Sequence, residues 1–132
     1  MKYIITGGTG HIGNNLARYL ISQKQEVKLL LRRSNDNAIN DIECVKVVGD
    51  IFDESFLLKE IEEDSIVIHL AALIDIENKN VELLQEVNFN LTVKIAQACI
   101  KKHIKKFIYV SSTDAINQMH GLIEKVDNFG LE

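Results

Sequence analysis

The sequence contains no proline in 132 residues, although about 5% is the average usage in proteins. A regular α/β core has this composition, and so does the first part of a longer protein whose loop-rich remainder is absent. Cysteine is scarce as well, since only Cys44 and Cys99 occur, each inside an apolar run. Two isolated thiols exclude a disulfide framework and a cysteine metal cluster. We therefore expect no metal site and a reducing, cytoplasmic setting.

The chain also lacks an excess of basic residues. It has 15 lysines and arginines against 19 aspartates and glutamates, a net charge of −4 and a pI of about 5.6. Proteins whose main partner is nucleic acid usually carry a basic excess, so we expect no nucleic-acid partner. No apolar run approaches the roughly 20 residues that span a bilayer, and the start of the chain predicts no signal peptide. These observations predict a cytoplasmic protein with no membrane partner.

Five short apolar runs alternate with helical patterns along the chain. The runs are typical of buried strands and cover residues 2–6, 27–31, 45–48, 66–70 and 107–110. The spacing of apolar residues predicts helices over residues 14–22, 54–62 and 81–102, and 122–129 is compatible with a last helix. Continuous apolar strands without hairpin signals indicate a parallel sheet that is covered on both faces. We predict one domain over residues 1–132, a doubly wound α/β Rossmann fold with strand order 3-2-1-4-5 that stops before a sixth strand.

A glycine-rich segment, TGGTGHIG at residues 6–13, is the strongest functional signal. It contains G-x-G-x-x-G between a predicted strand and a predicted helix, which is the context of dinucleotide binding. Glycine permits a tight turn and a close approach of the pyrophosphate. The N–H groups at the start of the following helix then face the negative charge. The alternative is a glycine-rich turn that binds no ligand.

The second predicted strand ends in LLLRRSND. Dinucleotide folds that bind NAD usually carry an acidic residue about 20 positions after the loop, for the ribose 2′-OH. Leu31 or Arg32 occupies that position here, and arginine suits a 2′-phosphate. The sequence therefore favours NADP, with NAD as the second choice. The alternative is that Arg32 and Arg33 form a solvated pair.

Four further motifs accompany the loop: GDI at 49–51, HLAA at 69–72, VNFNLT at 87–92 and YVSST at 109–113. With TGGTGHIG, this set resembles the extended short-chain dehydrogenase/reductase family, the NAD-dependent epimerase/dehydratase group. Within that group it looks closest to the dihydroflavonol-reductase-like branch. The resemblance covers nearly the whole chain up to about Asn117.

The resemblance implies roles for individual residues. Asp50 is expected to bind the adenine, with Ile51 beside the ring, and residues 70–72 to run along the nicotinamide ribose. Asn88 is expected near the active site. The candidate cofactor-binding residues, including the loop and Arg32, are Gly7, Gly10, His11, Ile12, Gly13, Arg32, Asp50, Ile51, Leu70, Ala71, Ala72 and Asn88. Ser112, with Thr113 as the near alternative, is the candidate catalytic hydroxyl that holds a substrate oxygen during hydride transfer.

Each of these residues also has a structural explanation. Asp50 is able to cap the turn that follows it, and residues 71–72 suit tight core packing. Asn88 is compatible with an exposed helix face, since Leu91 stands where the family has glycine. Ser112 is compatible with an ordinary hydroxyl at a strand end. His11 and His69 are expected to be structural, because neither has a partner at triad or metal spacing.

The resemblance also implies a Y-x-x-x-K pair, in which lysine lowers the tyrosine pKa. None of the three tyrosines has lysine four residues on, since those positions are Gly7, Gln23 and Thr113. The favoured hypothesis is the N-terminal part of a longer NADP-dependent reductase, epimerase or dehydratase, whose small-molecule substrate binds only to the full-length protein. One alternative is a stand-alone NADP sensor, and another is an interaction protein that no longer binds nucleotide.

The favoured hypothesis has a consequence for the fifth strand. A sheet that stops there exposes an edge, and exposed edges invite strand pairing. We therefore expect self-association of the chain near Phe107 and Tyr109 and the residues after Asp114.

Overall fold

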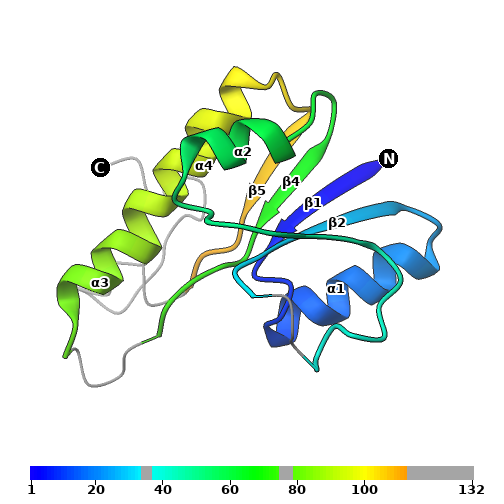
Figure 1. Ribbon diagram of the computed structural model, residues 1–132, viewed down its shortest axis with the longest axis horizontal. Helices are drawn as coiled ribbons and strands as arrows, with labels where there is room; N and C mark the ends of the chain where they lie inside the picture. Colours follow the sequence, from blue (N-terminus) through cyan, green and yellow to red (C-terminus); the bar gives the residue numbers. More distant parts are fainter. Residues whose placement is uncertain (34–36, 75–78, 113–132) are drawn as a thin grey trace, which may run out of the picture.

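Five parallel strands form a single sheet in the order β3-β2-β1-β4-β5 (Figure 1). The computed structural model describes residues 1–33, 37–74 and 79–112. The strands are β1 (Lys2–Thr6), β2 (Glu26–Leu31), β3 (Val45–Val48), β4 (Ile66–His69) and β5 (Lys106–Tyr109). The predicted Rossmann order 3-2-1-4-5 is confirmed. The predictions about Thr113, a helix at 122–129 and the absence of a sixth strand fall outside the described residues.

The described helices occupy the predicted segments, with differences of one to three residues in their bounds. α1 (His11–Ser22) begins earlier than predicted, because Gly10 is its N-cap and Gly13 lies inside its first turn. α2 (Glu54–Glu60) begins after Asp53, whose carboxylate accepts the N–H of Ser55, and ends before Glu62. The predicted helix over 81–102 is continuous but not uniform. It consists of α3 (Val81–Gln85), the π-helical turn η1 (Glu86–Asn90) and α4 (Leu91–Lys101).

The early end of α2 has a clear physical cause. Ile61 leaves the helix in an extended conformation and is fully buried in the core. The carbonyl of Glu60, freed by the end of the helix, accepts a hydrogen bond of 3.0 Å from the Lys28 ammonium on β2. Lys28 also lies 2.5 Å from a carboxylate oxygen of Glu62. Burial of one apolar side chain and pairing of one ammonium therefore stop the helix together.

Both faces of the sheet are buried over its three central strands, β2, β1 and β4. Successive strand residues alternate between two apolar clusters, so that Ile4 and Val67 pack on one side, and Ile5 and Ile68 on the other. The first cluster packs under α2 and α4 and the second under α1, as Figure 1 shows for the helices. Burial on two faces explains why the strands are continuous apolar runs.

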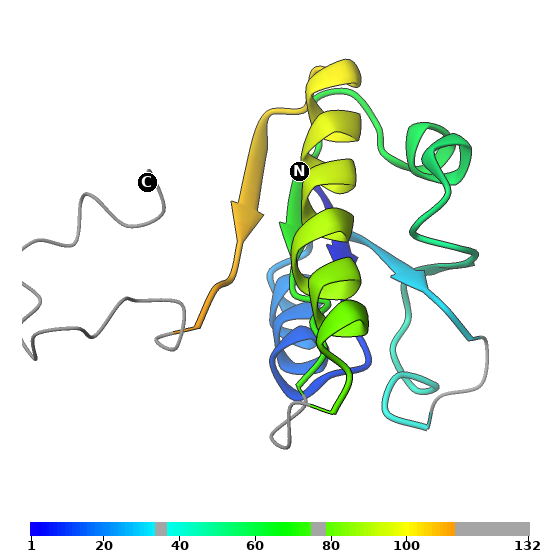
Figure 2. The same cartoon turned by 90° about the vertical axis from the view of Figure 1, so that its left-hand side faces the viewer.

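β5 forms an edge of the sheet and pairs only with β4 among the described strands (Figure 2). Ile108, Tyr109 and Val110 have exposed side chains on or beside this strand. An edge of this kind presents unpaired backbone groups to other chains.

We predict that the chain self-associates through β5. The mass measured by light scattering should rise with concentration above the 14.9 kDa of one chain. Tyr109→Lys should suppress this rise, because a charge on an edge strand opposes pairing. Val93→Lys, on the exposed surface of α4, adds the same charge and should leave association unchanged. A mass of one chain at all concentrations would contradict the prediction.

Candidate functional site

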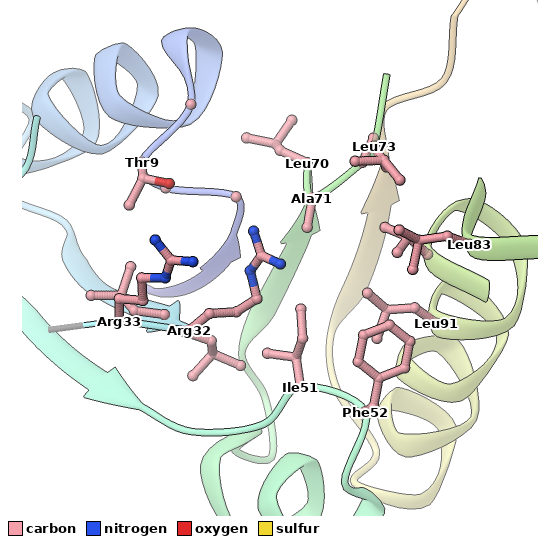
Figure 3. Close-up of a pocket in the computed structure, with 17 residues that line it drawn as sticks. Thr9, Arg32, Arg33, Ile51, Phe52, Leu70, Ala71, Leu73, Leu83 and Leu91 are labelled. Atoms are coloured by element: carbon pink, nitrogen blue, oxygen red, sulfur yellow. The ribbon is translucent and has the colours of Figure 1, made fainter. Parts of the chain in front are cut away.

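A cavity of about 390 Å³ lies at the carboxyl ends of the strands, where ligands bind in open α/β sheets (Figure 3). It opens where the chain crosses from one half of the sheet to the other, between β1 and β4. The residues that line it are Gly7, Gly8, Thr9, Gly10, Leu30, Leu31, Arg32, Arg33, Ile51, Phe52, Leu70, Ala71, Ala72, Leu73, Leu83, Val87 and Leu91. Segments distant in the sequence therefore form one site.

The glycine loop is built from contacts that admit no side chain. Gly7 has a φ of +76°, and a Cβ there would lie 2.6 Å from the backbone nitrogen of Ala71. A Cβ on Gly13 would lie 2.2 Å from the carbonyl oxygen of Gly7. These two glycines hold β1, β4 and α1 together, so Gly13 acts by packing and does not line the cavity.

The start of α1 points free N–H groups toward the loop. The N–H groups of the first turn of a helix have no partner within the helix. Gly10, the N-cap residue of α1, has no side chain that could accept a hydrogen bond from them. The first turn also contains no acidic residue. His11 and Ile12 have exposed side chains that do not line the cavity, so only their backbone is available to a ligand there. The partial positive charge at this end suits an anion such as a phosphate group.

Arg32 and Arg33 follow β2 directly and both line the cavity. Figure 3 shows their guanidinium groups pointing from the end of β2 toward the glycine loop and Thr9. Within the described part of the chain, neither guanidinium forms an ion pair or hydrogen bond. Two exposed cations beside an uncapped helix start make this end of the cavity electropositive.

The segment after β3 supplies another side of the cavity. Ile51 is buried and lines the cavity together with Phe52, and its place beside an adenine ring stays a prediction. Asp50 does not line the cavity, and its carboxylate accepts the N–H of Phe52 at 2.9 Å. The turn-capping role of Asp50 is therefore present, and its contact with adenine stays a prediction.

Leu70, Ala71 and Ala72 follow β4 and line the cavity, and their contact with a nicotinamide ribose stays a prediction. Asn88 is not a lining residue. It is half-buried, and its amide forms two hydrogen bonds with the backbone of Leu73, at 2.8 Å to the N–H and 2.9 Å to the carbonyl. The exposed-face interpretation of Asn88 is therefore wrong, and the side chain holds the loop that follows β4.

His69 is completely buried at the end of β4. Its Nδ1 lies 2.6 Å from the hydroxyl oxygen of Thr6, and its Nε2 lies 3.0 Å from that of Thr92. Its ring stacks on those of Phe107 and Tyr109. Burial lowers the pKa of His69 to about 4, so the ring is neutral at pH 7. These contacts agree with the structural role expected for this residue, and Thr6 and Thr92 are partners that sequence reasoning did not identify.

Ser112 follows β5, is exposed and does not line the cavity. Thr113 lies outside the described residues, so the structure gives no position for the second candidate hydroxyl. Within the described ranges, no three potential metal ligands gather in one place. None of the helices described is long and apolar enough to cross a membrane.

The buried, neutral His69 predicts a loss of stability in mild acid. Its pKa is near 6.5 when unfolded and about 4 when folded, so the unfolded chain binds more protons between these values. The contribution is complete above pH 6.5 and disappears as the pH falls toward 4. The free energy of unfolding in urea should be about 2 kcal/mol lower at pH 5 than at pH 7. His69→Phe should remove most of this difference, and equal values at the two pH values in the unmodified chain would refute it.

The family model for the 3-beta hydroxysteroid dehydrogenase/isomerase family matches residues 4–127. Among curated proteins, the dTDP-D-glucose 4,6-dehydratase of Dictyostelium discoideum is 34% identical over 96% of this chain and 32% of its own length. The sterol demethylase protein B of Methylococcus capsulatus is 27% identical over 88% of this chain and 36% of its own length. The chain thus spans about a third of the length of these relatives.

Solved structures show the same relationship. The UDP-glucose 4-epimerase of Thermotoga maritima, solved with UDP-glucose, matches with a TM-score of 0.75 and 26% identity over 88% of this chain and 39% of that one. The UDP-glucose-4-epimerase of Stenotrophomonas maltophila, solved with bound NAD, matches with a TM-score of 0.76 and 25% identity over 93% and 40%. The finer resemblance to the dihydroflavonol-reductase-like branch stays a prediction. The chain belongs to the 3-beta hydroxysteroid dehydrogenase/isomerase family, among the extended short-chain dehydrogenases and reductases of the epimerase/dehydratase type.

Proposed function

We propose that this chain is the NADP(H)-binding Rossmann domain of a longer oxidoreductase, epimerase or dehydratase. The observation that carries the proposal is the pair of guanidinium groups of Arg32 and Arg33, which pair with none of the residues that the structure describes and line the same cavity as the glycine loop. The pyrophosphate binds at the start of α1, and the adenine half lies between β2 and the segment of Ile51. The related Stenotrophomonas epimerase was solved with bound NAD, which supports a nicotinamide dinucleotide as the ligand.

The choice of NADP over NAD depends on the charge at the end of β2. A carboxylate at this position binds a ribose 2′-OH but repels a 2′-phosphate. Leu31 is buried in the core, and the residues that follow it on the cavity wall are two arginines. A guanidinium binds a phosphate through paired hydrogen bonds. Arg32 is the principal ligand that we propose, with Arg33 beside it.

In the full-length protein we propose hydride transfer between NADP(H) and a carbonyl or alcohol carbon of a small molecule. Leu70, Ala71 and Ala72 run beside the nicotinamide ribose, and the hydroxyl of Ser112 or Thr113 holds the substrate oxygen. The Y-x-x-x-K pair that the family resemblance implies is absent from these 132 residues. The chain alone should therefore bind the cofactor and show little or no turnover.

We predict that the chain binds NADPH more tightly than NADH in a calorimetric titration. Arg32→Ala should lower the affinity for NADPH about tenfold, because it removes a charged hydrogen bond to phosphate. The same change should leave the affinity for NADH unchanged. Lys59→Ala, which removes an exposed cation from α2 on the surface, is the control and should affect neither. Gly10→Val should abolish the binding of both, since its side chain occupies the start of α1.

Two results would overturn the proposal in different ways. Equal affinities for NADPH and NADH, with Arg32→Ala indistinguishable from the unmodified chain, would refute the NADP assignment alone. Failure to bind either dinucleotide would refute the cofactor-binding function of this chain.

A further inference from the structure

A continuous set of hydrogen bonds joins two opposite walls of the cavity through His69. On one side, Thr6 is the last residue of β1 and immediately precedes Gly7 of the glycine loop. On the other side, Thr92 lies at the start of α4, next to the lining residue Leu91. His69 contacts both hydroxyl groups, at 2.6 Å and 3.0 Å. The two threonines are thereby connected through a single imidazole ring.

The direction of each hydrogen bond follows from the number of available protons. The Thr6 hydroxyl oxygen accepts the N–H of Ala71 at 3.4 Å, and its single proton is directed at Nδ1 of His69. The Thr92 hydroxyl donates to the carbonyl of Asn88 at 3.1 Å, so its oxygen accepts from Nε2 of His69. A neutral imidazole has one donor and one acceptor nitrogen. The network therefore requires the Nε2–H tautomer.

The far end of this network reaches the cavity again. Asn88 lies in the π-helical turn η1, and its amide binds both backbone groups of Leu73. The backbone carbonyl of Asn88 accepts a hydrogen bond from the Thr92 hydroxyl. The loop after β4 is consequently fixed at two points, at Ala71 through Thr6 and at Leu73 through Asn88. His69 connects the two points through its hydrogen bonds to Thr6 and to Thr92.

A buried histidine with a purely structural role needs hydrogen-bond partners, but these partners need not lie beside a cavity. Here Thr6 adjoins Gly7 and accepts from the N–H of Ala71, while Thr92 adjoins Leu91 and is connected to Leu73 through Asn88. No charged side chain of the described residues takes part in the network, and the ring faces Phe107 and Tyr109 from β5. The arrangement suits a fixed spacer between two walls.

We propose that His69, as the Nε2–H tautomer, is a positioning residue that sets the separation of the glycine loop from the wall formed by Leu73 and η1. It thereby fixes the fit of the nicotinamide half of the dinucleotide. The adenine half, which lies toward Arg32 and Ile51, does not depend on this spacing. This proposal rests on the cofactor-binding function proposed above.

The test uses Thr92, because replacing His69 would change its ring contacts with Phe107 and Tyr109 together with its hydrogen bonds. Thr92→Val keeps the shape of the side chain but removes its hydroxyl group. The variant therefore loses both the hydrogen bond from Nε2 of His69 and the hydrogen bond to the carbonyl of Asn88. Thr92→Ser keeps both hydrogen bonds and is the matched control. Circular dichroism at the temperature of the titration verifies that each variant is folded. The ligands are NADPH and the fragment 2′,5′-ADP, which contains only the adenine half.

We expect Thr92→Val to lower the affinity for NADPH roughly tenfold, whereas 2′,5′-ADP should bind as it does to the unmodified chain. Thr92→Ser should bind both ligands within about twofold of the unmodified chain. Nitrogen-15 NMR of the ring should show a protonated Nε2 and an unprotonated Nδ1 in the unmodified chain.

Three outcomes would overturn the inference. The first is that Thr92→Val binds NADPH as Thr92→Ser does, and the second is that it weakens NADPH and 2′,5′-ADP equally, as general destabilisation would. The third is a proton on Nδ1. If the unmodified chain binds neither ligand, the failure is that of the proposed function, and the positioning role falls with it.

Discussion

The close approach of three backbone segments, at Gly7, Gly13 and Leu70–Ala71, is the constraint on which the rest of this structure depends. Added Cβ atoms at the two glycines would lie 2.6 Å and 2.2 Å from backbone atoms, well inside van der Waals contact. Glycine at both positions lets α1 start directly behind β1, so its free N–H groups face the end of the sheet. The same approach brings the loop after β4 beside the glycine loop. The position of these N–H groups follows from the packing of the backbone, and no side chain is needed to place them there.

The two sides of the site differ in chemistry. The side at β2 carries Arg32 and Arg33 and is electropositive, whereas the side at η1 is formed by Leu73, Leu83 and Val87 and is apolar. A dinucleotide has a matching asymmetry when its adenosine carries a 2′-phosphate. The polar groups beneath the apolar side are paired with one another through His69, so none of them competes for the ligand. Among the described residues, no buried side-chain nitrogen or oxygen lacks a hydrogen-bond partner.

The strand order and most of the cavity follow from local sequence patterns. Apolar runs, glycines and the arginines after β2 are features of neighbouring residues, and a known topology then brings them together. The start of α1 was predicted too late, because glycine disfavours helices and only the contact with Gly7 explains Gly13 inside one. The π-helical turn changes which side chains face the loop after β4, and a 3.6-residue period does not predict that change for Asn88. The contacts of His69 join residues 63 and 23 positions away, a distance over which sequence spacing carries no signal.

An amide NMR titration of the chain with NADP tests directly whether phosphate groups bind at the start of α1. The largest shifts are expected at the N–H groups of Gly10, His11, Ile12 and Gly13, with further shifts at Arg32 and Ala71. This pattern would show that the phosphate groups bind at the start of α1, with the ligand extending to both sides. Shifts confined to another surface, or none at saturating nucleotide, would contradict it.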